Sequence, residues 1–161
     1  MTRRGLLAGT AGLAALGAGA LALWPRRAAF AETFPVAKSP EEWAEILTEE
    51  EFAVLREEAT ERAFTSPLND EKRAGTYHCA GCATPVYESA TKFDSGTGWP
   101  SFWAAIEGQV GTKTDFALVL PRTEVHCATC GGHLGHIFSD GPRPTGERHC
   151  LNGVALDFVA A

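Results

Sequence analysis

Two pairs of cysteines carry the clearest chemical signal in this sequence. Cys79 and Cys82 form one C-x-x-C pair, and Cys127 and Cys130 form a second, with 44 residues between the pairs. A gap of two residues lets a tight turn point two thiolates at one ion, and two such turns complete a tetrahedral four-sulfur site. We therefore expect one zinc ion on these cysteines, structural because a closed site leaves no position open for a substrate. Two disulfides, or iron on the same thiolates, are the alternatives that the spacing leaves open.

The fifth cysteine, Cys150, is left without a partner by this scheme. Arg148 lies two residues before it and Asn152 two residues after it, so on an extended strand all three side chains share one face. The guanidinium favours the thiolate form of the cysteine, and the amide adds a neutral donor and acceptor. An inert buried thiol is the usual role of a single cysteine, but this context predicts a reactive one.

Three other side chains lie among glycines where a ligand could bind. His133 and His136 follow the second cysteine pair, and histidine can supply a proton near neutral pH. Surface or core histidines, or a second metal site, are the alternatives for this pair. Trp99 stands between Gly98 and Pro100. Aromatic residues are usually core, but in this turn Trp99 could form the wall of an apolar pocket.

The first 31 residues have the pattern of an export signal. Arg3 and Arg4 precede an apolar stretch, Gly5–Trp24, and small residues end at Ala31 just before the acidic Glu32. We predict a twin-arginine signal peptide over 1–31, cleavage near Ala31 and a functional domain over 32–161. The export machinery would then be a partner, and the product periplasmic or extracytoplasmic. A permanent membrane anchor is the alternative.

Composition limits the chain to one domain and excludes some partners. The 161 residues carry 14 basic and 20 acidic side chains, a net charge of −6. Loss of 1–31 removes four arginines and no acidic residue, which takes the charge to −10. A chain this acidic is not expected to bind nucleic acid.

The elements that must position these residues are two short helices followed by strands. Capping boxes at Ser39 and Thr48 predict the helices, the first with Trp43, Ile46 and Leu47 on one face and the second running to about Thr60. From Arg73 onward, turn residues separate short β-rich runs, which predicts a mainly β fold of antiparallel sheets. These runs are 76–78, 86–88, 116–120, 124–126, 137–139 and 154–159. The run 116–120 is apolar throughout and is expected to be the most buried strand.

Three further motifs, taken in order with the cysteine pairs, give a resemblance to a known family. They are Gly96-Thr97-Gly98-Trp99-Pro100-Ser101-Phe102, then His133-Leu134-Gly135-His136-Ile137-Phe138-Ser139-Asp140-Gly141-Pro142, then Arg148-His149-Cys150-Leu151-Asn152. Over about residues 41–160 the chain resembles the B-type peptide-methionine (R)-S-oxide reductases, the methionine-R-sulfoxide reductase B family.

The resemblance implies a fold, a reaction and roles for these residues. The fold would be β-tent-like, two antiparallel sheets with short N-terminal helices and a structural zinc on Cys79, Cys82, Cys127 and Cys130. The reaction would be reduction of the R epimer of methionine sulfoxide, protein-bound or free, in the repair of oxidised proteins. Cys150 would be the nucleophile and Trp99 the wall that receives the substrate methyl group, with His133, His136, Arg148 and Asn152 around the sulfoxide and the thiolate.

The chain departs from the family pattern beside the nucleophile. Many members have a second, resolving cysteine where this sequence has Thr97, so the resemblance implies a one-cysteine enzyme whose sulfenic acid is reduced by an external thiol, either thioredoxin-like or small. His149 stands where an aromatic residue is usual and could share the acid role, and Gly153 replaces a common serine. A non-catalytic binding module of the same fold and a thiol peroxidase or disulfide oxidoreductase are the alternative functions.

Overall fold

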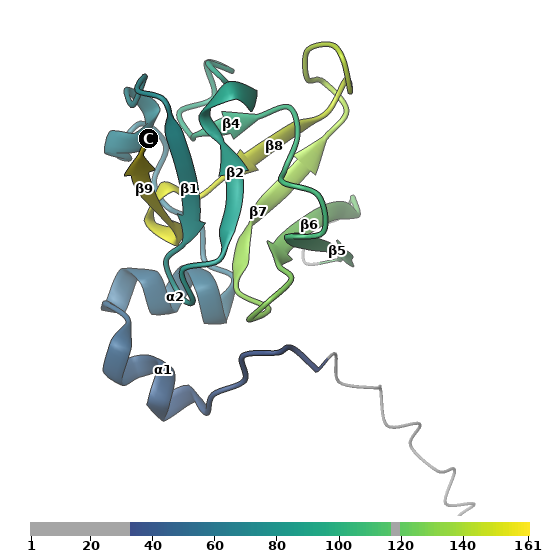
Figure 1. Cartoon of the computed structure of the whole chain (residues 1–161). Coiled ribbons are helices and arrows are strands. Elements are labelled where there is room, and N and C mark those ends of the chain that lie inside the picture. Colours follow the sequence, from purple (N-terminus) through teal and green to yellow (C-terminus); the bar gives the residue numbers. More distant parts are fainter. Residues whose placement is uncertain (1–32, 117–119) are drawn as a thin grey trace, which may run out of the picture. The chain divides into compact units, whose positions relative to one another are not determined.

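The computed structural model describes residues 33–116 and 120–161, which form two antiparallel sheets and two short helices (Figure 1). The mainly β class predicted from the sequence is therefore confirmed. The predicted signal peptide and its boundary at Glu32 lie outside the described residues. Within the described ranges, no helix has the length and apolar character needed to cross a membrane.

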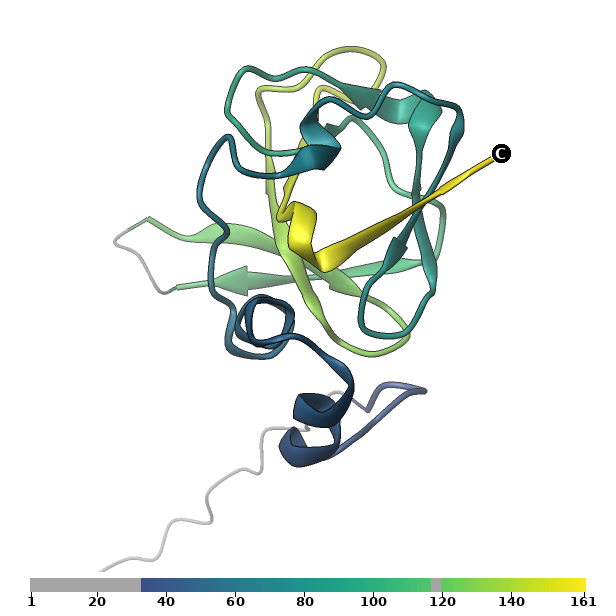
Figure 2. The same ribbon diagram turned by 90° about the vertical axis from the view of Figure 1, so that its left-hand side faces the viewer.

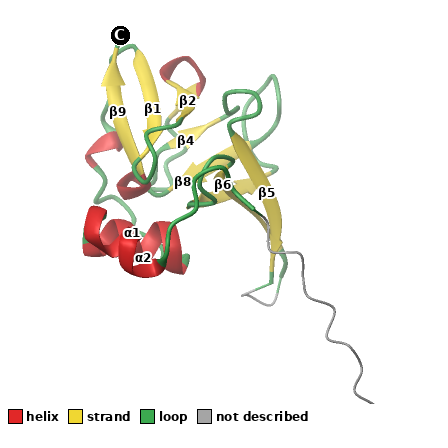
Figure 3. Cartoon of the chain, turned by 60° about the horizontal axis from the view of Figure 1, so that its bottom comes forward, coloured by secondary structure: helices red, strands yellow, loops and turns green. Residues whose placement is uncertain are grey.

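Both helices begin at the predicted capping boxes and pack at one end of the sheets (Figure 3). Helix α1 (Pro40–Ile46) is capped by Ser39, and α2 (Glu49–Glu57) by Thr48. Two details of the prediction are wrong. Ile46 is 56% exposed, because this helix of seven residues, about two turns, buries only Trp43, and the next apolar side chain to be buried is Leu47 at the C-cap. Helix α2 ends at Glu57, before the predicted end, because Glu58 takes a left-handed conformation with φ 59°.

The smaller sheet has three strands in the order β2-β1-β9. Strand β1 (Gly75–Cys79) pairs with β2 (Pro85–Glu88) on one side and with β9 (Leu156–Ala160) on the other. Of the predicted run 154–159, residues 156–159 belong to β9. Residues Gly153–Ala155 form a short 3-10 turn that leads the chain into this strand, as Figure 2 shows.

The larger sheet has six strands in the order β3-β4-β8-β7-β6-β5. These are β3 (Lys92–Phe93), β4 (Ser101–Phe102), β5 (Val110–Asp115), β6 (Arg122–Cys127), β7 (His133–Phe138) and β8 (Arg148–Leu151). Strand β8, which carries the arginine and the cysteine of the third motif, lies between β4 and β7 (Figure 1). The site is therefore placed in the interior of the sheet, where its backbone is bonded on both sides.

Aromatic side chains fill the space where the sheets meet. Tyr77 of β1 and Tyr87 of β2 are fully buried, and both contact Phe102 of β4 with ring centroids 4.9 and 4.7 Å apart. Because β4 is hydrogen-bonded to β8, this cluster connects the smaller sheet directly to the strand of the site.

The prediction of a buried strand over 116–120 is wrong at its two described ends, Phe116 and Leu120. The preceding strand, β5, ends at Asp115, and Phe116 and Leu120 are 75% and 76% exposed. Residues 117–119 lie outside the described residues. Phe116 is exposed because it follows the end of β5, which is the edge strand of the larger sheet.

Candidate functional site

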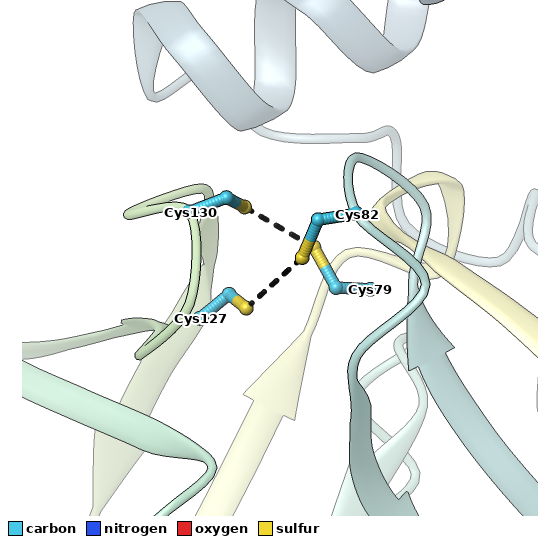
Figure 4. A group of neighbouring side chains, drawn as sticks. All are labelled: Cys79, Cys82, Cys127 and Cys130. Carbon is cyan, nitrogen blue, oxygen red and sulfur yellow. Dashed lines mark hydrogen bonds between the residues drawn. The ribbon is translucent and has the colours of Figure 1, made fainter. Parts of the chain in front are cut away.

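The four cysteines of the two C-x-x-C pairs converge on one point (Figure 4). Their sulfur atoms all lie within 4.8 Å of one another, with Cys79 Sγ 3.7 Å from Cys130 Sγ and Cys82 Sγ 3.6 Å from Cys127 Sγ. A tetrahedral ion with metal–sulfur bonds of about 2.3 Å needs sulfurs about 3.8 Å apart, whereas a disulfide needs about 2.05 Å. The donor set and its spacing therefore fit a four-thiolate metal site, and all five cysteines are unpaired thiols.

The two turns that present these cysteines connect two different pairs of strands, β1 with β2 and β6 with β7. The first turn follows β1, where Cys82 N–H donates to the Cys79 carbonyl at 3.2 Å and Ala83, with φ 57°, reverses the chain. The second follows β6, where Gly131 takes the left-handed conformation with φ 68°. Since β1 belongs to the smaller sheet and β6 to the larger one, an ion at this point would fasten the two sheets together.

Helix α2 covers the cysteine cluster with an arginine that the sequence analysis did not single out. Arg56 donates to the Cys130 carbonyl at 2.9 Å and to Cys130 Sγ at 3.2 Å. On its other side the guanidinium lies 3.7 Å from the ring centroid of Trp43. A cation held against a four-thiolate cluster offsets part of its negative charge.

Cys150 lies on β8 and is half-buried, separate from the four-cysteine cluster. Its direct neighbours across the sheet are Ser101 on β4 and His136 on β7. Arg148 shares its face, as predicted, and donates two hydrogen bonds of 2.9 Å to Asp140. These bonds raise the pKa of Arg148, and the nearby Cys150 raises it further, so the guanidinium stays charged beside the sulfur.

Each motif histidine is held by a carboxylate. His133 Nδ1 is 2.8 Å from Glu124, which is itself buried, and His136 Nε2 is 2.8 Å from Asp115. The two imidazole rings meet edge to face, with centroids 5.3 Å apart. Burial lowers the pKa of His133 to about 4 and also lowers the pKa of His136. Both rings are therefore mainly neutral near pH 7, and the bonded carboxylate fixes which nitrogen carries the proton.

His149 does not share the acid role that its position beside Cys150 suggested. Successive residues of a strand face opposite ways, and the His149 ring points into the core, where Nδ1 lies 2.9 Å from the Tyr87 hydroxyl. Its Nε2 lies 3.3 Å from Glu147, and burial lowers its pKa. His149 is thus part of the core, with its ring 5.6 Å from that of Tyr87.

Trp99 and Asn152 are brought together by Glu61, which follows α2 in the chain. The Trp99 indole N–H donates to the Glu61 carbonyl at 2.9 Å, and the Glu61 N–H donates to the Asn152 side-chain oxygen at 2.9 Å. The Glu61 carboxylate accepts from the Gly153 N–H at 2.6 Å. Sequence reasoning missed Glu61 because it lies 38 residues from Trp99 and 91 from Asn152, with no local pattern to connect them.

The site brings together one accessible thiol, a fixed cation, two carboxylate-bound imidazoles and an aromatic side chain on neighbouring loops and strands. A cleft of about 910 Å3 elsewhere, between α2 and β9, carries charged side chains of both signs and does not include Cys150. Fold and site together define a small β protein in which a cysteine cluster positioned to bind a metal joins turns of the two sheets, and a separate, half-buried thiol lies on a central strand of the larger sheet.

Comparison with known proteins agrees with this class. Residues 47–160 match the SelR domain family. The chain is 55% identical over 122 residues to "Peptide methionine sulfoxide reductase MsrB" of Pseudomonas putida (strain W619), covering 75% of this chain and 92% of the relative. It is 51% identical over 127 residues to the protein of the same name from Leifsonia xyli subsp. xyli, covering 78% and 91%. Identity to "Peptide methionine sulfoxide reductase B1, chloroplastic" of Arabidopsis thaliana is 52% over 123 residues, covering 76% and 61%. The chain belongs to the SelR family, the family of these MsrB reductases.

Proposed function

We propose that this protein is a peptide-methionine (R)-S-oxide reductase that uses Cys150 as its nucleophile. The observation that carries the proposal is the position of this thiol. It is half-buried on β8, separate from the metal-type cluster, beside the charged Arg148 and opposite His136. The names of the relatives support methionine sulfoxide as the substrate and do not favour a non-catalytic binding module.

The reaction follows from the electronic nature of a sulfoxide. Its sulfur becomes electrophilic when the oxygen is protonated or strongly hydrogen-bonded, so the site needs a thiolate on one side and a proton donor on the other. The Cys150 thiolate attacks the substrate sulfur, the oxygen takes up a proton, and the oxygen is then transferred to the enzyme's sulfur. Methionine leaves, and Cys150 remains as a sulfenic acid. The substrate sulfur loses its oxygen and gains two electrons, and the Cys150 sulfur supplies these electrons and receives the oxygen.

His136 is the better placed of the two motif histidines to handle the proton. It lies directly across the sheet from Cys150, whereas His133 is almost completely buried and its pKa is about 4. With Nε2 bonded to Asp115, Nδ1 of His136 can accept the proton of the Cys150 thiol and pass it to the substrate oxygen, directly or through one water molecule. His133, bound to Glu124, would then hold the shape of the pocket and the orientation of the His136 ring.

The remaining site residues bind and orient the substrate. Trp99 would pack against the substrate methyl group, since its indole N–H is already used by Glu61 and the ring face is what remains for a ligand. Asn152 is buried and bonded at both ends of its amide, to Leu134 and to Glu61, so it fixes the loop after β8. Arg148 would place its fixed positive charge beside the attacking sulfur.

The sulfenic acid must be reduced from outside the chain. The other four cysteines lie in the cluster, and residue 97 is a threonine. An external thiol would attack the Cys150 sulfur, release water and leave a mixed disulfide, and a second thiol would then resolve this disulfide. The second thiol can belong to the same thioredoxin-like protein or to another small molecule.

We also propose zinc for the four-cysteine cluster and export for the whole chain. Zinc favours a closed tetrahedral site of four thiolates, has no redox chemistry of its own and would hold the turns after β1 and β6 together. The proposal of a twin-arginine signal over 1–31, with a periplasmic or other extracytoplasmic product, is supported by the sequence pattern of Arg3, Arg4 and Ala31. Loading the metal in a reducing cytoplasm before export would protect these thiolates from oxidation.

The test compares the protein with its Cys150→Ser variant on both epimers of a methionine sulfoxide peptide, with a dithiol as reductant. The proposal predicts turnover of the R epimer only, complete loss of turnover in the variant, and an unchanged zinc content and melting temperature. Unchanged binding and no turnover in either protein would favour the binding module. Faster turnover of peroxide than of the R sulfoxide would favour a thiol peroxidase.

A further inference from the structure

Three hydroxyl side chains form a continuous line that ends at the sulfur of Cys150. Thr97 Oγ1 lies 3.7 Å from Cys150 Sγ and 2.8 Å from Ser95 Oγ. Ser95 Oγ lies 2.7 Å from Ser101 Oγ, and the Ser101 hydroxyl donates to the Trp99 carbonyl at 3.1 Å. Ser101 is fully buried, and its strand β4 is paired with β8 at Cys150 itself. The line is thus built into the sheet.

The number of available protons decides which group donates in each hydrogen bond along this line. Each hydroxyl can donate once, and the carbonyl at the far end can only accept. When Cys150 is a thiol, four protons serve four contacts. All of these contacts are satisfied only if the thiol donates to Thr97, Thr97 to Ser95, Ser95 to Ser101, and Ser101 to the carbonyl. In this state, Thr97 accepts from the sulfur.

Ionisation of Cys150 reverses the contact at the sulfur. A thiolate can only accept, so three protons now serve four contacts and one contact must lose its proton. If Thr97 turns its hydroxyl toward the sulfur and Ser95 turns toward Thr97, the thiolate gains a charge-assisted hydrogen bond. The contact that is given up then lies at Ser101, between two neutral groups, where a hydrogen bond is worth less.

We propose that Ser101, Ser95 and Thr97 form a reversible hydroxyl relay in which Thr97 donates to the Cys150 thiolate and Ser101 opposes this reversal by its bond to the Trp99 carbonyl. This assignment rests on the proposed role of Cys150 as the nucleophile. Thr97 is then a catalytic residue, because it contacts the reacting sulfur, and Ser95 and Ser101 are positioning residues. The threonine at the place of a resolving cysteine thereby has a chemical role of its own.

The relay predicts opposite effects for its two ends, which a merely structural role would not produce. Thr97→Val removes the donor to the thiolate and should make Cys150 less reactive. Ser101→Ala removes the group that pulls the protons toward the carbonyl. In that variant two contacts remain, and the thiolate form satisfies both of them when Ser95 donates to Thr97 and Thr97 to the sulfur, so ionisation no longer costs a hydrogen bond. Ser101→Ala should therefore make Cys150 more reactive.

The experiment measures the rate of Cys150 alkylation by iodoacetamide against pH in the metal-loaded protein, with the modified peptide quantified by mass spectrometry. We expect Thr97→Val to slow alkylation at pH 7 about three- to tenfold and to move the profile to higher pH. Thr97→Ser, which keeps the hydroxyl, should stay within about twofold of the unsubstituted protein. Ser101→Ala should move the profile to lower pH. Thr112→Val, the same change at an exposed position on β5, is the matched control and should have no effect.

Other groups that face Cys150 are unchanged in all of these variants. They are Arg148 on its own strand and His136 on β7, while β4 contributes only the Ser101 hydroxyl. A shift of the Thr97→Val and Ser101→Ala profiles in the same direction, or no shift in either, would overturn the relay. Alkylation needs no sulfoxide, so the test is separate from turnover. Absence of R-sulfoxide turnover in the unsubstituted protein would refute the proposed function and leave the alkylation result to decide the relay.

Discussion

Replacement of Trp99 should weaken substrate binding much more than it changes the thiol. The ring would contact the substrate methyl group and one neighbouring methylene, each worth about 0.8 kcal/mol on burial. Loss of both contacts in Trp99→Ala costs about 1.6 kcal/mol, which raises KM for a peptide R-sulfoxide roughly 15-fold. The rate of Cys150 alkylation should change less than about twofold, because the Trp99 indole N–H is bonded to Glu61 and not to the sulfur.

A second substitution separates the ring face from the hydrogen bond. Trp99→Phe keeps an aromatic wall and loses only the 2.9 Å bond to the Glu61 carbonyl, so KM should rise about two- to threefold. Steady-state kinetics with a peptide R-sulfoxide and a constant thiol reductant give KM and kcat for each variant, and circular dichroism checks that each one is folded. An unchanged KM in a folded Trp99→Ala variant, with the whole loss in kcat, would refute the assignment of Trp99 as the substrate wall.

Three further predictions concern metal, pH and the cation of the site. Arg56→Met should release zinc to a chromogenic chelator several times faster than the unsubstituted protein, with Arg56→Lys in between. The reason is that the guanidinium bonded to Cys130 offsets part of the negative charge of the thiolates. Equal release rates in all three proteins would exclude this role. Stability should fall as pH drops from about 6.5 to 4, because the unfolded chain then binds a proton that buried His133, with its pKa of about 4, does not. Urea unfolding at pH 7.5 and 5 should show a smaller loss in His133→Gln, and an equal loss in both proteins would contradict this assignment. Asp140→Asn should leave the melting temperature almost unchanged, since the Asp140 side chain is 64% exposed. It should lower kcat about five- to twentyfold, because Arg148 loses the bond that fixes it beside the sulfur. An unchanged kcat would show that catalysis does not need this ion pair.

Local signals in the sequence were sufficient wherever structure depends on neighbouring residues. The capping boxes at Ser39 and Thr48 placed both helix starts, because a cap is formed within four residues. The two C-x-x-C pairs also predicted the cysteine cluster, although its turns are 44 residues apart, because a four-thiolate metal site requires both pairs to meet at one ion. Side chains alternate between the two faces of a strand, so the sequence predicted that Arg148 and Cys150 share one face. The interaction between the two side chains in the structure agrees with this prediction.

Features that depend on distant partners were not predictable in this way. Phe116 and Leu120 were expected to be buried, but burial requires an element to cover them, and Phe116 follows the end of an edge strand. The partners of the two histidines, Glu124 and Asp115, come from other strands, and Glu61 reaches the site from the segment after α2. Such contacts are set by strand register and tertiary packing, for which one sequence contains no local sign.

The most direct test of the division of labour among the five cysteines is a single turnover without reductant, followed by mass spectrometry of the intact and digested protein. After one equivalent of a peptide methionine R-sulfoxide, we predict a mass gain of one oxygen atom, located on Cys150 and trapped there by a sulfenic-acid reagent. The S epimer should give no gain, and the zinc ion should remain bound in both cases. Oxidation of Cys79, Cys82, Cys127 or Cys130 in place of Cys150, or equal gains from the two epimers, would contradict the account.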